Sequence, residues 1–231
     1  MQNIPKIRIV VATRESQEDF FAKTATGKSL SLHQFPFLEF RLFEKNSQGL
    51  STVYNIAIEE SKFDPAVLVF VHDDVWILDY YWVQQVISWL QHFHILGLAG
   101  NTKCYPKQAS WATKDEFHTY DPSNLSGIIG HGESFPPSQL NVYGDPCQEV
   151  SVLDGLMLIV LSEILIEKNL RFDERFKFNF YDMDFCRQAR LKGLKLGTVP
   201  ISVVHQSWGN FKSKDYENTF KAYLSKWEDS A

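Results

Sequence analysis

The sequence predicts an α/β protein with a mostly parallel central sheet flanked by helices. Short apolar runs rich in β-branched residues alternate with longer amphipathic segments along the chain. Strand, helix and strand follow one another at the spacing expected of right-handed crossovers, which join parallel neighbours. The 231 residues are 44% hydrophobic and 22% charged, an ordinary globular balance. That length allows a sizeable core, and we expect a single domain over residues 1–231.

The first third of the chain predicts three strands and one helix. Residues 6–13 (KIRIVVAT) and 37–44 (FLEFRLFE) are apolar or β-branched runs that end at polar turns. Ser51 predicts the N-cap of a helix that continues through residues 54–60. Residues 65–75 (PAVLVFVHDDV) follow as the next buried strand.

The middle of the chain starts regularly and then loses its periodicity. Residues 79–94 predict an amphipathic helix and residues 95–100 a short strand. Residues 101–149 are rich in Gly, Pro, Ser and Asp, with little periodicity. A structureless loop of that length is unusual inside a compact domain. We expect either an irregular flap that closes over a ligand or a plain surface insertion.

Regular structure resumes in the last third of the chain. Residues 149–155 (EVSVLDG) predict a strand, and residues 156–169 (LMLIVLSEILIEKN) predict a helix. Another strand is expected within residues 195–209, ending at His205, and the tail over residues 214–230 is expected to be helical.

Charge, cysteine content and hydropathy exclude several classes of protein. The net charge is −5 and the pI about 5.8, so the chain lacks the basic field of a nucleic-acid binder, and we expect no nucleic-acid partner. Cys104, Cys147 and Cys186 show no metal-binding spacing and are expected to be reduced thiols. The chain also lacks a signal-peptide h-region and a transmembrane segment of about 18 apolar residues. We therefore expect a soluble, cytoplasmic protein.

A histidine and two aspartates, His72, Asp73 and Asp74, follow the apolar run 67–71. Adjacent carboxylates repel and lose hydration in a partly closed site, so they need a cation, a helix N-terminus or open solvent. Ligands bind beyond the carboxyl ends of parallel strands, where carboxylate and phosphate oxygens suit Mg²⁺ or Mn²⁺. The cluster is therefore either a metal site or the cap of a short helical turn around Trp76.

A second acidic cluster, YDMDF at residues 181–185, stands at the start of a predicted helix. Asp182 and Asp184 in a first helical turn are favoured by the helix macrodipole, which is sufficient to explain them. Either could instead be a general base that takes a proton from an acceptor hydroxyl. His205, at the end of an apolar strand, is open to a structural or a ligand role.

Three segments, in this order, resemble a known family: VLVFVHDDV, VLDGLMLIV and LRFDERFKFNFYDMDFCRQARLKGLKLGTVPISVVHQSWG. They resemble nucleotide-sugar glycosyltransferases of the GT-A fold, closest to the family-2-like group of small bacterial proteins. The upstream GLSTVYNIAIEES also matches that group, and the resemblance covers residues 6–209. Two aspartates after a strand are common, but the ordered set is specific. The resemblance implies a Rossmann-like sheet of the nucleotide-diphospho-sugar transferase type.

The resemblance implies roles for the first acidic cluster and for His205. Asp74 occupies the Asp-x-Asp position and would bind the Mn²⁺ or Mg²⁺ that bridges the two phosphates of the donor. Asp73 would support the ribose or the metal shell. His205 would be a further metal ligand or a pyrophosphate contact. His72 stands where the family often has an acidic residue.

The resemblance also implies residues for the rest of the donor. Thr13, Arg14 and Glu15, after the first strand, fall where the family holds the base and ribose of the nucleotide. Asp154 and Gly155 would line the groove for the donor sugar and the acceptor.

For catalysis, Asp182 matches the base of the inverting members. The family usually has Glu-Asp there, but this chain has Tyr181-Asp182, so Asp182 and Asp184 both remain candidates for the base. The implied reaction is in-line displacement at the anomeric carbon, in which the metal stabilises charge on the departing nucleoside diphosphate. The implied partners are a nucleotide-diphosphate sugar donor and a glycan or other hydroxyl acceptor, as in polysaccharide biosynthesis.

The residues also bear on two other functions. Nucleotidyl transfer usually needs a glycine-rich phosphate loop after the first strand, and TGKS at residues 26–29 lacks that spacing. A GT-A-like module that binds a sugar nucleotide or glycan without turnover remains open, because His72 and Tyr181 depart from the family pattern.

Overall fold

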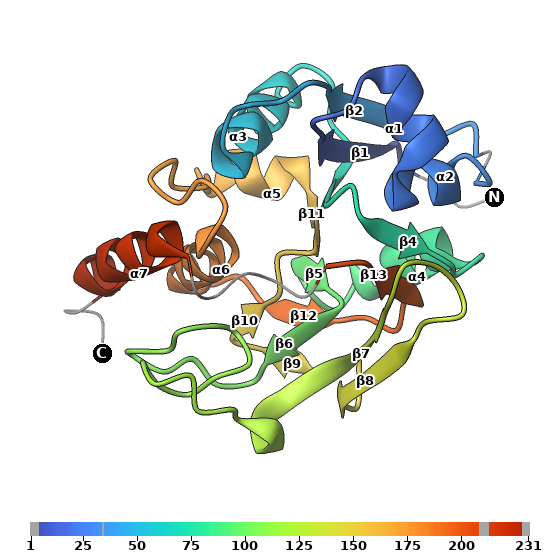
Figure 1. The fold of residues 1–231 in the computed structure, drawn as a ribbon. Coiled ribbons are helices and arrows are strands. Elements are labelled where there is room, and N and C mark those ends of the chain that lie inside the picture. Colours follow the sequence, from blue (N-terminus) through green and yellow to red (C-terminus); the bar gives the residue numbers. More distant parts are fainter. Residues whose placement is uncertain (1–4, 34, 208–212, 228–231) are drawn as a thin grey trace.

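The predicted α/β class is confirmed by a computed structural model, which describes residues 5–33, 35–207 and 213–227 (Figure 1). The chain forms two sheets flanked by helices. The larger sheet has seven strands, which in spatial order are β2 (Leu38–Phe43), β1 (Ile7–Ala12), β3 (Val67–Val71), β11 (Met157–Leu161), β5 (Ile95–Gly97), β12 (Leu196–Thr198) and β9 (Glu149–Val150).

The larger sheet is mixed rather than purely parallel. Strand β1 pairs in parallel with β2 and β3, and β12 pairs in parallel with β5. Strand β11 runs antiparallel to both of its neighbours, β3 and β5. The chain enters β11 from the carboxyl end of β3, where His72 N donates to Leu156 O at 3.1 Å. A strand that starts at that edge has to run antiparallel to β3.

The prediction of one helix over residues 156–169 is wrong in its first half. Residues Met157–Leu161 form β11, and only Ser162–Glu167 form the short helix α5. Met157 to Val160 are fully buried in the middle of the sheet. A continuous apolar run that is buried on both faces shows no strand period, so the sequence does not separate it from a buried helix.

Helices cover both faces of the larger sheet. Alternate residues of β1 point to opposite faces: Val10 packs into one core cluster, and Ile9 and Val11 into the other. The first core is covered by α3 (Leu50–Glu60), α5, α6 (Tyr181–Leu191) and α7 (Lys214–Trp227). The second is covered by α1 (Gln17–Lys23), α2 (Ala25–Leu30) and α4 (Trp82–Trp89).

Several helix boundaries differ from the expectations, and α4 covers only Trp82–Trp89 of the predicted residues 79–94. Helix α3 begins after Gly49, so Ser51 is inside the helix rather than its N-cap. The buried Ser51 hydroxyl donates instead to Phe176 O at 2.5 Å, and this ties α3 to the segment before α6. Helix α7 is described to Trp227, and the predicted helical residues 228–230 lie outside the described part of the chain.

Three predicted strands each divide into two strands that belong to different sheets. Residues 95–100, 149–155 and 195–209 give β5, β9 and β12 in the larger sheet, and β6 (Ala99–Asn101), β10 (Val152–Leu153) and β13 (Val203–His205) in the smaller one. The positions 208 and 209 lie outside the described residues. The smaller sheet is completed by β7 (Leu125–His131), β4 (Val75–Ile77) and β8 (Gln139–Gly144). At these three places the chain passes directly from the larger sheet into the smaller one, so the two sheets are adjacent there.

The segment 101–149 is only partly irregular. Strands β7 and β8 form an antiparallel hairpin in the smaller sheet (Figure 1), where β7 also pairs with β6 and β13. The hairpin is preceded by the short 3₁₀ helix η1 (Pro122–Asn124). Residues 103–121 contain only an isolated bridge between Thr113 and Tyr120. Among the described residues, no helix combines the length and the apolar composition needed to cross a membrane. The cysteines form no disulfide.

Candidate metal centre and catalytic cavity

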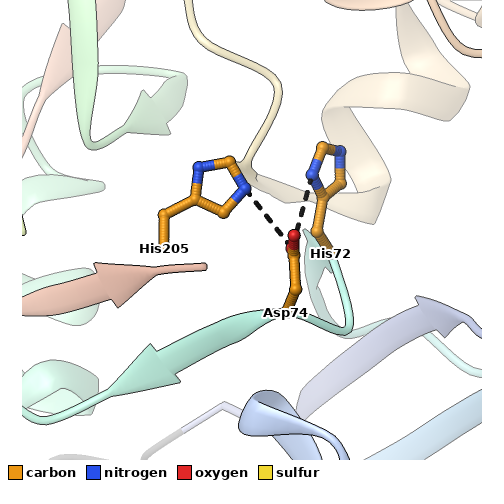
Figure 2. Close-up of side chains that lie close together, drawn as sticks. All are labelled: His72, Asp74 and His205. Atoms are coloured by element: carbon orange, nitrogen blue, oxygen red, sulfur yellow. Dashed lines mark ion pairs between the residues drawn. The ribbon is translucent and has the colours of Figure 1, made fainter. Parts of the chain in front are cut away.

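His72, Asp74 and His205 converge where the two sheets meet (Figure 2). His72 and Asp74 lie in the turn between β3 and β4, and His205 is the last residue of β13. Strand β13 pairs antiparallel with β4 and sets His205 opposite Val75, beside Asp74. Each of the three side chains offers one ligand atom, and these atoms lie within 4.8 Å of one another. Both ring nitrogens that face Asp74 approach the same oxygen, Oδ1, at 3.3 Å from His205 Nε2 and 4.0 Å from His72 Nδ1.

The arrangement excludes the helix-cap interpretation of the first acidic cluster. The residues after Asp74 form strand β4 and not a helical turn around Trp76. The turn itself is held by the buried Thr26 of α2, whose hydroxyl contacts His72 O at 2.6 Å and accepts from Val75 N at 3.1 Å. The conformation of the cluster is therefore fixed by its neighbours, and its charges need another explanation.

The three side chains fit a divalent cation. The buried Asp74 Oδ1 makes no aligned hydrogen bond to any described residue, although two imidazole nitrogens lie close to it. A buried carboxylate oxygen in that state carries a desolvation cost that a cation would offset. Imidazole nitrogen and carboxylate oxygen are both ordinary ligands of first-row divalent metals.

The electrostatics of the cluster favour positive charge beside Asp74. Burial lowers the pKa of His72 to about 4, so its imidazole is neutral at pH 7 and has a free lone pair. Burial acts to raise the pKa of Asp74, but the imidazoles of His205 and His72 outweigh burial and hold that pKa below its usual range. Burial acts to lower the pKa of His205, but the carboxylate of Asp74 outweighs it and raises that pKa.

Asp73 makes a different set of contacts. Its Oδ2 accepts a hydrogen bond from Thr13 Oγ1 at 2.7 Å, because β1 and β3 are parallel neighbours whose carboxyl ends meet. Thr13 Oγ1 also accepts from Glu15 N at 3.2 Å. Burial raises the pKa of Asp73, despite the hydrogen bond from Thr13. The structure thus brings Thr13, Glu15 and Asp73 together and leaves Arg14 exposed beside them.

A cavity of about 1140 Å³ opens beside the metal-type cluster, and both His72 and His205 line it. Asp154, Gly155 and Asp182 also line it, so it joins the two acidic clusters. Its aromatic wall comes largely from the segment 101–149 and from the start of α6, and includes Trp111, Tyr120, Tyr143 and Phe178. That segment therefore forms part of the site instead of being a plain surface insertion.

Asp182 stands at the cavity, in the first turn of α6. Each carboxylate oxygen accepts one backbone hydrogen bond, Oδ2 from Gly155 N and Oδ1 from Met183 N, both at 2.9 Å. Burial, together with the negative charge of Asp154, raises the pKa of Asp182 to about 7. A carboxyl group with that pKa can exchange a proton near neutral pH, as a general base must.

Asp184 lies two residues later but does not line the cavity. It is fully buried, and its oxygens accept hydrogen bonds or ion pairs from Lys226 Nζ at 2.6 Å, Gln188 Nε2 at 2.7 Å and Trp227 Nε1 at 3.0 Å. These contacts use its carboxylate to join α6 to α7. The geometry therefore separates the two aspartates that the sequence left as alternatives.

Gly155 is packed against the start of α6. A Cβ atom built there would lie 2.3 Å from Tyr181 Oη, so no larger residue fits without displacement. Tyr181 Oη lies 2.8 Å from both Gly155 O and His72 Nε2. His72 and Tyr181, the two positions that depart from the resembled pattern, are thus in direct contact. Burial also raises the pKa of Asp154, which accepts a hydrogen bond from Leu156 N at 3.1 Å.

Sequence reasoning missed Phe180, the residue whose backbone sets the direction of Tyr181 and Asp182. Phe180, the N-cap of α6, has left-handed backbone angles (φ 64°, ψ 2°), which are unfavourable for a non-glycine residue. Its ring is stacked on Phe220 and Tyr223 of α7, with centroid distances of 5.3 and 5.0 Å. The aromatic contacts with α7 hold the strained turn in place. A backbone angle of this kind leaves no signal in the sequence.

Solved structures of glycosyltransferases share the fold. The catalytic domain of Drosophila β1,4-galactosyltransferase 7, in complex with xylobiose, matches with a TM-score of 0.53 and 12% identity, covering 94% of this chain and 80% of that one. S. aureus TarS 1–349 gives 0.52 and 15%, over 93% and 63%. GalNAc-T7 with UDP, GalNAc and Mn²⁺ gives 0.52 and 10%, over 99% and 50%. The chain thus spans one half to two thirds of the latter two proteins.

The sequence itself places the chain in a family. A search of curated proteins finds no match. The model of the "Glycosyltransferase like family" matches residues 12–227, a range that includes every candidate site residue. This match covers most of the chain, and the solved structures agree with it in fold. The chain belongs to this family and is a glycosyltransferase of the GT-A fold.

Proposed function

We propose that this protein transfers a sugar from a nucleoside-diphosphate donor to an acceptor hydroxyl, with inversion and with a bound divalent metal. One observation carries the proposal. The cluster of His72, Asp74 and His205 opens into the same cavity as Asp182, the carboxyl group with a pKa of about 7. A cation beside a leaving diphosphate and a base beside an acceptor hydroxyl are the two groups that such a transfer needs.

The nucleotide is assigned to the carboxyl ends of β1 and β3. Thr13 and Asp73 are linked there by a hydrogen bond, and the Asp73 carboxylate has further acceptor capacity for the ribose hydroxyls. The exposed Arg14 supplies a cation for a phosphate or the base, and Glu15 supplies a second carboxylate. Solved GalNAc-T7, which has the same fold, contains UDP and Mn²⁺.

The metal and the donor sugar are assigned to the space between the carboxyl ends of β1 and β3 and the cavity that Asp182 lines. His72, Asp74 and His205 would hold Mn²⁺ or Mg²⁺, which would stabilise the negative charge that builds on the diphosphate. Asp154 and Gly155, on the cavity side of this cluster, line the space for the sugar ring.

Asp182 is assigned as the general base. Each of its oxygens holds one backbone N–H group, and its remaining lone pairs are available to the acceptor hydroxyl. The acceptor oxygen forms the new bond to the anomeric carbon while its proton moves to Asp182. The bond from that carbon to the diphosphate oxygen breaks on the opposite side, which inverts the configuration.

The acceptor is assigned to the aromatic side of the cavity. Trp111, Tyr143 and Phe178 offer flat apolar faces, and the apolar C–H face of a sugar ring packs on such faces. Asn141 and Asn179 line the same space and supply polar hydrogen-bonding groups. This combination favours a glycan or another polyhydroxylated acceptor.

The first experiment measures the binding of UDP and GDP by calorimetry, with Mn²⁺ and then with chelator, in the wild type and in Asp74→Ala. We expect binding that needs both the metal and Asp74. A panel of UDP- and GDP-sugars is then tested for release of the nucleoside diphosphate, with Asp182→Asn as the variant. We expect Asp182→Asn to bind the donor normally but to lose about 10²–10⁴-fold in rate.

The outcomes separate the transferase from a binding module. Tight donor binding with no turnover in the wild type would favour a silent sugar-nucleotide or glycan-binding domain. Nucleotide binding that is indifferent to chelator and to Asp74→Ala would contradict the metal-dependent mechanism.

A further inference from the structure

Tyr181 connects a candidate metal ligand to the backbone of the catalytic cavity. Its hydroxyl oxygen lies 2.8 Å from His72 Nε2 on one side and 2.8 Å from Gly155 O on the other. The Tyr181 side chain is buried, with 3% of the residue exposed. A hydroxyl in that position has its hydrogen-bond partners fixed by the protein instead of by water.

The direction of these two hydrogen bonds follows from their chemistry. Gly155 O is a carbonyl oxygen and can only accept, so Tyr181 uses its single O–H proton to donate to it. The hydroxyl can then take part in the contact with His72 only as an acceptor. His72 Nε2 must therefore be the donor and carry the proton of the neutral ring.

The other nitrogen of the ring is thereby left with a free lone pair. A neutral imidazole that is protonated at Nε2 has its lone pair on Nδ1, and Nδ1 is the atom that faces Asp74 Oδ1 at 4.0 Å (Figure 2). Both atoms are then acceptors, and neither can donate to the other. Phe178 is stacked on the His72 ring, with a centroid distance of 5.9 Å, and helps to keep the ring in this orientation.

We propose that Tyr181 is a positioning residue that locks His72 as the Nε2–H tautomer and holds its Nδ1 lone pair on the metal. This inference rests on the proposed function, since it concerns the same cation. It narrows the choice of metal, because the site offers two imidazole nitrogens, His72 Nδ1 and His205 Nε2, and one carboxylate oxygen. Mg²⁺ prefers oxygen ligands, whereas Mn²⁺ and later first-row ions accept imidazole readily.

Hydrogen bonds to the far nitrogen of a ligating histidine fix its ring and raise its basicity. Removing such a partner typically weakens metal binding by about 10–100-fold. The variant Tyr181→Phe removes only the hydroxyl and keeps the ring in the core. Tyr54→Phe is its matched control. Tyr54 is buried beside Tyr181, with a centroid distance of 6.0 Å, but its hydroxyl makes no hydrogen bond with any described residue.

The test has two parts and uses the full chain. Calorimetry with Mn²⁺ and Mg²⁺ alone gives the affinities of the wild type, Tyr181→Phe and Tyr54→Phe. We expect the wild type to bind Mn²⁺ at least about 10-fold more tightly than Mg²⁺. Tyr181→Phe should weaken Mn²⁺ binding by about 10–100-fold, and Tyr54→Phe should leave it unchanged. The ¹⁵N chemical shifts of His72 in the metal-free wild type should show protonated Nε2, a readout that needs no variant.

A double variant separates a positioning role from a general structural one. In a His72→Ala background, Tyr181→Phe should cause no further loss of Mn²⁺ affinity, because the hydroxyl acts through His72. A wild type in which Nδ1 carries the proton, or an equal loss from Tyr181→Phe in both backgrounds, would overturn the inference and leave the proposed function standing. A wild type that binds no divalent ion at all would overturn both.

Discussion

Asp184 Oδ1 and Lys226 Nζ lie 2.6 Å apart, and this ion pair joins the first turn of α6 to the C-terminal helix α7. Trp227 Nε1 donates to the same oxygen at 3.0 Å. Burial raises the pKa of Asp184, and the hydrogen bond and charge of Lys226 act against that rise. Asp182, two residues earlier, instead reaches the cavity. The two aspartates of one motif therefore divide into a structural residue and a candidate base.

The first prediction concerns the structural aspartate. Asp184→Ala removes the carboxylate that accepts a hydrogen bond from the indole of Trp227. It also removes the buried partner of Lys226. Breaking a buried pair by removing one partner costs about 3–5 kcal/mol. Lys226 is partly exposed and also pairs with Asp173, so we expect the free energy of unfolding to fall by about 3 kcal/mol. Urea unfolding measures this loss. If Asp184→Ala instead abolished turnover at unchanged stability, Asp184 would be the base.

The second prediction is the pH dependence of stability contributed by Asp182. Its pKa is about 7 in the folded protein, against 3.8 for an unperturbed aspartate, so the folded state binds more protons than the unfolded state between these pH values. Stability from this group therefore falls as the pH rises from about 4 to about 7. Asp182→Asn cannot titrate and should lose this dependence. We expect the free energy of unfolding of the variant minus that of the wild type to be larger at pH 8 than at pH 5, so the variant gains stability relative to the wild type as the pH rises.

The third prediction is the pH dependence of the rate. A general base works only when it is deprotonated, so the transfer rate should rise with pH and level off above about 7. Rates measured from pH 5.5 to pH 9, at saturating donor and metal, test this. A rate that is already constant below pH 6 would assign the base to a group other than Asp182.

The fourth prediction concerns the donor. Thr13→Val keeps the shape of the side chain but removes the hydroxyl that donates to Asp73 at 2.7 Å. Without this bond the Asp73 carboxylate loses the partner that orients it toward the nucleotide, and we expect roughly a 5-fold weaker nucleotide affinity, the equivalent of about 1 kcal/mol. Thr219→Val is the matched control, since its hydroxyl donates within α7 to Asp215 O. Equal affinities in wild type and Thr13→Val would remove Thr13 from the donor site.

The sequence predicted that the site residues lie close together, but it predicted the strands and helices of the fold less well. Residues 72–74 and His205 follow apolar strands, and strand ends in an α/β fold gather at one edge, so their proximity could be expected. The same reasoning failed for residues 156–169, since burial on both faces removes the alternation that identifies a strand. It also failed for the three strands that change sheets, because a short break between two apolar strands carries no hydrophobic signal.

Individual roles depended on contacts that only the fold supplies. Asp182 and Asp184 are equivalent in the sequence, and their difference arises from Gly155 on one side and Lys226 on the other. His72 departs from the pattern of the resembled family, yet it is one of the three residues of the metal-type cluster. Its partner Tyr181 lies 109 residues away in the sequence, so no local pattern links the two residues.

The packing around Gly155 makes the two halves of the reaction interdependent. Its N–H group holds Asp182 and its C=O group holds Tyr181, which in turn holds His72. A single residue thus supports both the candidate base and a candidate metal ligand, and a side chain at this position would displace both. Substitutions at His72, Tyr181 and Asp182 should therefore be epistatic, and an engineer who alters the candidate metal site would have to readjust the candidate base as well.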